Sequence, residues 1–283
     1  MCGIVAYIGE KDAYPVIIEG LRRLEYRGYD SAGVAMLNGG IEVYKKKGKV
    51  KDLEDYIGAS KPVSSIGMGH TRWATHGEPN DVNAHPHLSE TERIAIVHNG
   101  IIENYSVLKE ALENLGHSFV SDTDTEVLAH LIEEYQKRDN LNLEDAVRKT
   151  LARVEGAYAI VLLDKEEPNK IVAARKGSPL VVGIGENEFL LASDATPIVG
   201  HTKQVIYLKD EEIVTVTRDG TYKITNIENQ AKSADVKEID LKLEELEKGN
   251  YDHFMLKEIH QQPETIKDAM RGRMDAHKGW IKL

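Results

Sequence analysis

The stretch Gly3-Ile4-Val5-Ala6-Tyr7-Ile8, directly after Cys2, is an unbroken apolar run that predicts a buried strand. The residues from Pro15 to Tyr26 follow with apolar side chains at helical spacing and a proline in the first turn, which predicts a helix. The segment Asn38-Gly39-Gly40 is typical of a hairpin turn. Further strands are expected around this turn and beyond it, at 31–37, 41–44, 66–71 and 94–98.

The middle of the chain changes from strands to helices and then back to strands. Apolar spacing predicts helices over 104–115, with Gly116 just past the end, and over 142–154. Between them, Thr123-Asp124-Thr125-Glu126 matches a capping box that would open a third helix. Such blocks predict an α+β fold in which sheets pack against helical layers. Strand patterns return at 157–163, 171–174, 180–184, 189–192, 204–208, 213–217 and 222–224.

The composition shifts after about residue 230. Residues 236–248 are rich in Glu, Lys and Leu, and residues 253–270 predict a polar helix interrupted at Pro263. We therefore expect one domain over 2–230 and a helical linker over 231–283. Because the sequence ends on the apolar segment Trp280-Ile281-Lys282-Leu283, we also expect that more chain once followed.

Composition and charge argue against several functional classes. The chain has 283 residues, 41% of them hydrophobic, and a formal net charge of −11, so a nucleic-acid or anionic-membrane partner is not expected. The short run Lys45-Lys46-Lys47 fits a solvated strand end. No apolar segment approaches the ~20 residues of a membrane span, and no secretory signal is evident. One cysteine cannot form an internal disulfide, so we expect a cytoplasmic protein. One cysteine also excludes a cysteine-based zinc site, and His85 and His87 flank a proline, which argues for a loop. We therefore expect no metal, and we expect no cofactor.

Cys2 is the first candidate for chemistry. Removal of Met1 would give Cys2 a free α-amine beside its thiol. An unperturbed α-amine has a pKa of about 7.7–8.0 and a cysteine about 8.5, so the amine can accept the thiol proton without a histidine base. Considered alone, Cys2 is equally compatible with an ordinary small residue at the start of a strand.

Two further segments offer groups that would serve a nucleophile. The run Gly69-His70-Thr71-Arg72-Trp73-Ala74-Thr75-His76-Gly77-Glu78-Pro79 places an arginine, suited to a bidentate grip on a carboxylate, before a turn that could close as a lid. Alone, Arg72 could form a surface ion pair and Trp73 could pack in the core. Asn99 and Gly100 offer two N–H donors for an oxyanion hole, or a plain turn. Asp124 could bind an ammonium group, or only stabilise a helix N-terminus.

Together these segments resemble the class II glutamine amidotransferases, which are N-terminal nucleophile hydrolases. More narrowly, the chain is similar to the glutaminase domains of the glucosamine-6-phosphate synthase family over essentially its whole length. Ala6 departs from the pattern, since that family usually carries glycine there. The resemblance rests on the residues Met1–Val5, Leu24–Gly33, Gly69–Pro79, Val97–Asn104 and Thr123–Glu126.

The resemblance implies a four-layer αββα sandwich and a role for each matching residue. Cys2 would attack the side-chain amide of L-glutamine, and Asn99 and Gly100 would hold the oxyanion. The same likeness implies that sugar-isomerase domains, absent here, would use the ammonia to convert fructose-6-phosphate to glucosamine-6-phosphate in a homo-oligomeric full-length enzyme. It further assigns the α-carboxylate to Arg72 with Thr75 and His76, the α-ammonium to Asp124 with the Gly100 carbonyl, gating to Trp73, and positioning to Arg27.

Two other functions remain open from the sequence. An N-terminal nucleophile amidase could act on another amide, although the paired clamps for a free amino acid argue against this. A non-catalytic glutamine-binding module would result if Met1 is retained, because the base would then be lost in a peptide bond.

Overall fold

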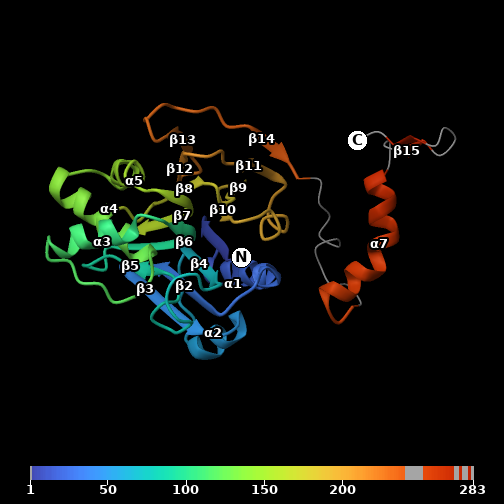
Figure 1. Ribbon diagram of the computed structural model, residues 1–283, viewed down its shortest axis with the longest axis horizontal. Helices are drawn as coiled ribbons and strands as arrows, with labels where there is room; N and C mark the ends of the chain where they lie inside the picture. Colours follow the sequence, from blue (N-terminus) through green and yellow to red (C-terminus); the bar gives the residue numbers. More distant parts are fainter. Residues whose placement is uncertain (1, 240–250, 271–273, 276–279, 282–283) are drawn as a thin grey trace. The chain divides into compact units, whose positions relative to one another are not determined.

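The computed structural model describes residues 2–239, 251–270, 274–275 and 280–281 (Figure 1). The chain divides into two units, Met1–Asp240 and Leu241–Leu283, which are considered separately. The first unit contains two antiparallel sheets and the helices that cover them. This arrangement confirms the predicted α+β fold.

An eight-stranded sheet contains the N-terminal strand near its middle. Its strand order is β14-β11-β9-β10-β1-β4-β2-β3, and all neighbours are antiparallel. The strands are β1 (Gly3–Ile8), β2 (Ser31–Leu37), β3 (Ile41–Lys47), β4 (Ile66–Arg72), β9 (Val181–Ile184), β10 (Phe189–Ala192), β11 (Gln204–Tyr207) and β14 (Val236–Glu238).

A six-stranded sheet forms the second layer of strands. Its order is β13-β12-β8-β7-β6-β5, again with antiparallel neighbours. The strands are β5 (His87–Leu88), β6 (Ile94–Ile102), β7 (Gly156–Asp164), β8 (Lys170–Lys176), β12 (Glu212–Thr217) and β13 (Tyr222–Asn226).

Helices cover the outer faces of the two sheets, which gives four layers (Figure 1). The eight-stranded sheet carries α1 (Ala13–Leu24), the short turn η1 (Glu25–Arg27) and α2 (Val50–Ile57). The six-stranded sheet carries α3 (Tyr105–Glu113), α4 (Thr125–Asp139) and α5 (Leu143–Leu151). The αββα order expected from the resemblance is therefore present.

The alternation of β1 shows how the layers are built. Ile4, Ala6 and Ile8 face the core between the two sheets, whereas Val5 and Tyr7 pack against the helices on the other face. All five side chains are at most 1% exposed. Because both faces of this strand are covered, its sequence is apolar throughout instead of alternating with polar residues.

One open alternative and one local prediction do not hold, and both matter for the site. Asn99 and Gly100 do not form a turn, because β6 continues to Ile102 and pairs with β7 across both residues. The capping box does not form either: α4 begins at Thr125, and the Asp124 side chain makes no cap. Glu126 instead accepts hydrogen bonds from the backbone of the preceding connection.

The C-terminal unit contains helix α7 (Phe254–Met270) and the paired strands β15 (Met274–Asp275) and β16 (Trp280–Ile281). The predicted interruption at Pro263 is wrong, since this residue lies inside α7. A proline removes one backbone donor and kinks a helix, but it need not end one. In the first unit, β14 pairs with β11, so the compact unit extends past residue 230. The predicted division into domains at that point stays a prediction.

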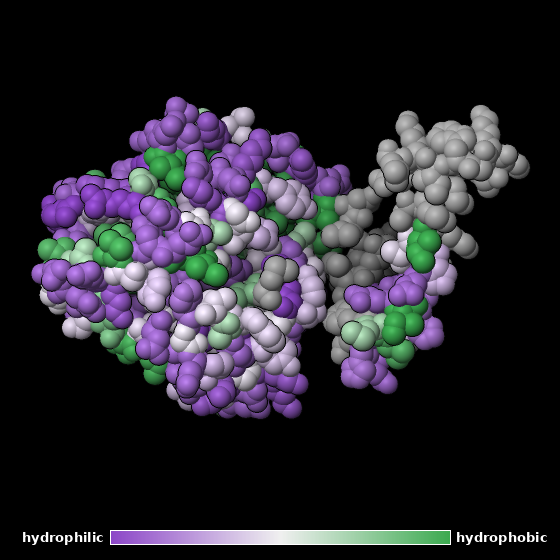
Figure 2. All heavy atoms as spheres, in the orientation of Figure 1, coloured by the Kyte–Doolittle hydropathy of each residue, from purple (hydrophilic) through white to green (hydrophobic). Residues whose placement is uncertain are grey.

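On the face shown in Figure 2, hydrophilic residues dominate and apolar ones occur in small separate areas. Within the described part of the chain, no helix combines the length and apolar character needed to cross a membrane.

Candidate active site

Cys2 lies at the start of β1, next to the end of β4. The pairing of Gly3 with Thr71 brings Trp73 beside the thiol, whose Sγ accepts a hydrogen bond from the Trp73 backbone N–H at 3.2 Å. Burial raises the pKa of the Cys2 thiol above its usual value, and the Trp73 N–H only partly opposes this. A thiol in this setting needs a nearby base to become a nucleophile.

The second sheet supplies the candidate oxyanion donors. Asn99 on β6 donates from Nδ2 to the Cys2 carbonyl at 3.3 Å, and its Oδ1 lies 2.8 Å from His70 Nε2. Gly100 follows with φ of +137°, and a Cβ there would lie 2.0 Å from the Ala157 carbonyl oxygen. Only glycine therefore fits this strand position, and the amide of Asn99 is held beside the nucleophile.

Arg72 ends β4 and is 3% exposed. Its guanidinium donates to the carbonyls of His76, Gly77 (3.1 Å) and Glu78 (3.4 Å). Asp30 lies 3.9 Å from Nη1. The arginine thus organises the loop that follows it, and a bound carboxylate would compete with the loop carbonyls for its N–H groups.

The loop after β4 carries the other residues of this run. Trp73 is 54% exposed, and its ring lies against Gly28, where a Cβ would come within 2.8 Å of the ring. The Ala74 backbone N–H donates to Asp30. His76 packs edge-on against Tyr105, with 5.2 Å between ring centroids. An exposed tryptophan on a loop held by a few hydrogen bonds has the features of a movable cover.

Asp124 is 4% exposed and precedes α4. Its Oδ2 accepts a hydrogen bond from the Ile102 backbone N–H at 2.8 Å. The carboxylate therefore stabilises the end of β6 instead of capping α4. This contact fixes an acidic group close to Gly100.

Two cavities meet at Cys2. The inner one, about 20 Å³, is lined by Cys2, Arg72, Thr75, His76, Gly100 and Asp124, among others. Its volume admits about one water molecule. The outer cavity, about 470 Å³, shares Cys2, Trp73, Thr75 and Gly100 with the inner one and adds Arg27, Asn99, Ile101, Glu103, Ala157, Ser178 and Pro179. All the predicted site residues are thus gathered around the two cavities.

Arg27 lines the outer cavity from η1. Its Nη1 donates to the Ser193 carbonyl at 3.3 Å and pairs with Asp194 at 3.2 Å. The Ser193 hydroxyl in turn accepts a hydrogen bond from the Ile4 backbone N–H. Arg27 is therefore connected to β1 through Ser193, two residues from the nucleophile.

Sequence reasoning missed a row of buried histidines behind these cavities, His70, His85, His87 and His98. The rings of His70 and His85 lie 4.4 Å apart, and those of His85 and His87 lie 4.5 Å apart. The Thr125 hydroxyl contacts His85 Nε2 and His98 Nδ1, both at 2.9 Å. We name these four residues the inner histidines.

Burial keeps the inner histidines neutral. It lowers the pKa of His70 to about 3, and it lowers the pKa values of His85 and His87 well below the usual range. The pKa of His98 is also lowered by burial. A neutral His70 facing Asn99 Oδ1 must donate from Nε2, which orients the amide toward Cys2. The positions of these residues in the sequence carry no signal of this, because three strands bring them together.

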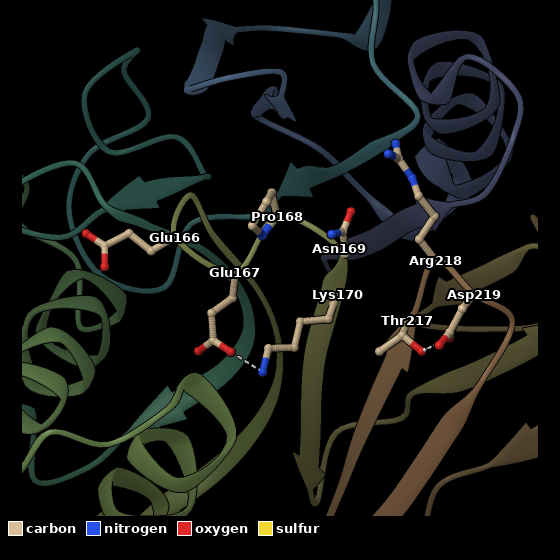
Figure 3. A pocket seen from close by; sticks show the side chains of 8 residues that line it. All are labelled: Glu166, Glu167, Pro168, Asn169, Lys170, Thr217, Arg218 and Asp219. Carbon is tan, nitrogen blue, oxygen red and sulfur yellow. Dashed lines mark hydrogen bonds and ion pairs between the residues drawn. The ribbon is translucent and has the colours of Figure 1, made fainter.

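A larger cavity, about 690 Å³, lies at the β7–β8 and β12–β13 turns (Figure 3). Figure 3 shows Glu167 directed toward Lys170 and Thr217 toward Asp219. These polar groups satisfy one another and do not converge on a common point. The cavity therefore lacks the features of a catalytic centre despite its size.

Comparison with known proteins finds relatives that match the whole chain. Glutamine–fructose-6-phosphate aminotransferase (isomerizing) of Bacteroides thetaiotaomicron is 57% identical over 285 residues, covering 100% of this chain and 46% of the relative. The protein of the same name in Chlorobaculum tepidum is 54% identical over 287 residues, covering 100% and 47%. The chain thus spans about half the length of these relatives.

The fold also matches a solved structure, the glutamine phosphoribosylpyrophosphate (PRPP) amidotransferase from B. subtilis complexed with ADP and GMP. The TM-score is 0.70 at 27% identity, over 81% of this chain and 50% of that one. A model of the glutamine amidotransferase domain matches residues 52–240. Because that match covers more than half of the sequence, the chain belongs to the glutamine amidotransferase domain family.

Proposed function

We propose that this chain hydrolyses L-glutamine to glutamate and ammonia through a thioester on Cys2. The observation that carries the proposal is that the thiol, the Asn99 amide, the Arg72 guanidinium and the Asp124 carboxylate surround two adjoining cavities. A free amino acid with a reactive side-chain amide needs a nucleophile, an oxyanion hole, a cationic clamp and an anionic clamp. These four residues supply one of each.

The reaction follows from these groups. Cys2 Sγ attacks the side-chain amide carbon, and the thiol proton passes to the α-amine that Cys2 gains when Met1 is removed. The negative oxygen of the tetrahedral intermediate accepts from Asn99 Nδ2 and the Gly100 backbone N–H. The C–N bond breaks, ammonia leaves with the proton, and a thioester remains. Water then attacks the thioester, which releases glutamate and restores the thiol.

Substrate entry requires the loop after β4 to move. The inner cavity of about 20 Å³ is too small for an amino acid. Arg72 donates to the loop carbonyls in this state, so a substrate α-carboxylate would replace them, with Thr75 and His76 alongside. Asp124 and the Gly100 carbonyl would take the α-ammonium. Trp73 would then close over the bound glutamine, while Arg27 positions the surroundings of Cys2.

The proposal extends to the longer protein that the relatives suggest. The ammonia would pass to sugar-isomerase domains that convert fructose-6-phosphate to glucosamine-6-phosphate in a homo-oligomeric cytoplasmic enzyme. In this arrangement residues 2–230 form the glutaminase domain and residues 231–283 lead to the acceptor domains.

The test is glutamine turnover by wild-type protein and by Cys2→Ala, after mass analysis has shown that Met1 is absent. Turnover should fall to background in Cys2→Ala, whereas Asn169→Ala, a matched control in the distant cavity of Figure 3, should be unchanged. Unaltered turnover in Cys2→Ala would refute the proposal.

The same assay separates the competing functions. Arg72→Lys and Asp124→Asn should raise KM for glutamine, and N-acylated glutamine should be a poor substrate. Efficient cleavage of the acylated compound would favour an amidase of another specificity. Glutamine binding without turnover, in protein that retains Met1, would indicate a non-catalytic module.

A further inference from the structure

Three side chains outside the proposed active site converge on one point. Glu90 comes from the β5–β6 turn, His117 from the α3–α4 connection and His130 from the middle of α4. One ligand atom from each residue lies within 4.8 Å of the other two. The set therefore joins three separate segments of the fold.

The distances within this set fit the edges of a metal-coordination tetrahedron. His117 Nδ1 lies 3.1 Å from His130 Nδ1, and Glu90 Oε2 lies 3.5 Å from His130 Nδ1 and 3.9 Å from His117 Nδ1. Three ligands held 2.0–2.2 Å from a tetrahedral zinc ion would lie roughly 3.3–3.6 Å from one another. No large movement is needed to reach that geometry.

The Nε2 atoms of both rings, which point away from the three-residue cluster, each face a carboxylate. His117 Nε2 faces Glu134 Oε2 at 3.5 Å, and His130 Nε2 faces Glu126 Oε1 at 3.6 Å. When Nδ1 of each ring binds a metal ion, the ring proton lies on Nε2, where Glu134 and Glu126 can accept a hydrogen bond from it. Two lone pairs 3.1 Å apart repel each other unless a proton or a metal ion lies between them.

The groups around His117 and His130 favour a metal ion over a proton between the two Nδ1 atoms. The Val120 and Ser121 backbone N–H groups and the Ser121 hydroxyl donate to Glu126, which holds its carboxylate behind His130. Glu90 Oε2 is fixed by the Ser118 backbone N–H at 2.9 Å. Phe119 stacks on the His130 ring, with 4.5 Å between centroids. Carboxylates behind metal-bound histidines are the usual outer support of a zinc site.

We propose that Glu90, His117 and His130 form a binding site for a divalent transition metal of the zinc type, with water as the fourth ligand. Two imidazoles and one carboxylate suit zinc better than the hard cations, which prefer oxygen ligands. The proposal departs from the expectation that the chain holds no metal, which stays a prediction. The wide spacing of the three ligands along the sequence gave no motif from which to predict the site.

Metal binding would restrain the connection between α3 and α4. His117 stands at the start of that connection, and its far end is Asp124, in the proposed active site. The bound ion would tie the connection to α4 and to the β5–β6 turn. We assign the site a structural role, independent of the proposed glutamine hydrolysis.

The test measures metal affinity in the full chain carrying Cys2→Ser, so that the thiol cannot bind the ion. Zinc competed against a chromophoric chelator should bind at one equivalent, and cobalt(II) should give the intense visible absorption of tetrahedral coordination. His117→Gln and His130→Gln should each weaken zinc binding by at least about 100-fold. Glu134→Gln should weaken it by about 10–100-fold.

His201→Gln is the matched control, since His201 follows β10 and lies outside the cluster. Its zinc affinity should equal that of the parent. Circular dichroism confirms folding of each variant, and the cobalt spectrum of the parent needs no variant at all. Absence of saturable zinc binding, an octahedral cobalt spectrum, or equal affinity in folded His117→Gln and His130→Gln would each overturn the proposal.

Discussion

Two groups of histidines flank the N-terminal part of α4, and their surroundings differ sharply. The inner histidines contact hydroxyl groups, an amide and one another, and burial lowers their pKa values. We call Glu90, His117 and His130 the outer cluster. Its two histidines face carboxylates on both ring nitrogens.

The difference shows that the same residue type serves opposite electrostatic purposes within one fold. An imidazole among neutral partners stays uncharged and works as a rigid hydrogen-bonding spacer. An imidazole between carboxylates can hold a cation. The first kind supports the groups around Cys2, whereas the second kind suits a metal ion.

The largest expected effect concerns Asn99, the residue that links the inner histidines to the proposed reaction. His70 orients Asn99, and Asn99→Ala removes a donor from the oxyanion hole. Glutaminase kcat should fall by about 10²–10³-fold, with little change in KM. Steady-state kinetics measure this, with Asn169→Ala as the reference. A kcat within threefold of wild type would mean that Asn99 does not stabilise the intermediate.

The next effect concerns Glu126, which lies 3.6 Å from His130 of the outer cluster. Its carboxylate accepts from the Val120 and Ser121 backbone N–H groups and from the Ser121 hydroxyl. Glu126→Ala leaves these donors without an acceptor and should lower the free energy of unfolding by about 3 kcal/mol. Urea denaturation checks the value. Glu90→Ala, at an exposed position, should cost less than about 1 kcal/mol, and equal losses would contradict the assignment.

The pH dependence of stability distinguishes the inner histidines directly. An unfolded His70 binds a proton below about pH 6.5, whereas the folded ring stays neutral down to about pH 3. The unfolded state therefore holds more protons in this window, and the free energy of unfolding falls as the pH falls. From pH 6.5 to 5 the contribution of His70 is about 2 kcal/mol.

Urea denaturation of wild-type protein and His70→Gln at both pH values isolates this contribution. The variant should lose about 2 kcal/mol less than wild type between the two pH values, whatever its absolute stability. Parallel losses would show that His70 is protonated in the folded protein. Glu126 titrates in a lower window, because its carboxylate contributes stability above its usual pKa of 4.5 that is lost as the pH falls toward 2.

Much of the fold follows from local patterns in the sequence. The strand after Cys2, the hairpin at Asn38-Gly39-Gly40 and the helices of the middle segment lie where apolar spacing predicts them. Helix α2, which no expectation included, covers the eight-stranded sheet with three buried apolar residues, Val50, Leu53 and Ile57. Its eight residues are too few for a clear helical period.

The candidate site was predicted residue by residue, but its geometry was not. Local patterns suggested a turn at Asn99-Gly100 and a cap at Asp124. An Asn-Gly pair fits a turn as well as a strand, and a Thr-x-x-Glu spacing fits a capped helix as well as an uncapped one. Pairing with β7 keeps Gly100 in a strand. The Asp124 carboxylate accepts a hydrogen bond from the Ile102 N–H and does not cap α4. Tertiary contacts decide such positions, and a single sequence does not contain them.

The smallest effect is expected for His117→Gln in a chelating buffer. Without metal, the His117 ring lies 3.1 Å from His130 Nδ1, 3.9 Å from the exposed Glu90 and 3.5 Å from Glu134, whose side chain is 19% exposed. Exposed ion pairs contribute about 0–1 kcal/mol, so the stability loss should stay below about 1 kcal/mol and glutaminase kcat/KM should be unchanged.

Thermal denaturation with and without zinc completes the comparison. At a zinc concentration 100-fold above its Kd, the free energy of unfolding of wild type should rise by about 2.7 kcal/mol, because zinc binds the folded protein and not the unfolded chain. That of His117→Gln should not change, because its outer cluster is incomplete. Equal gains in both proteins would place the metal elsewhere and remove the contrast between the two groups of histidines.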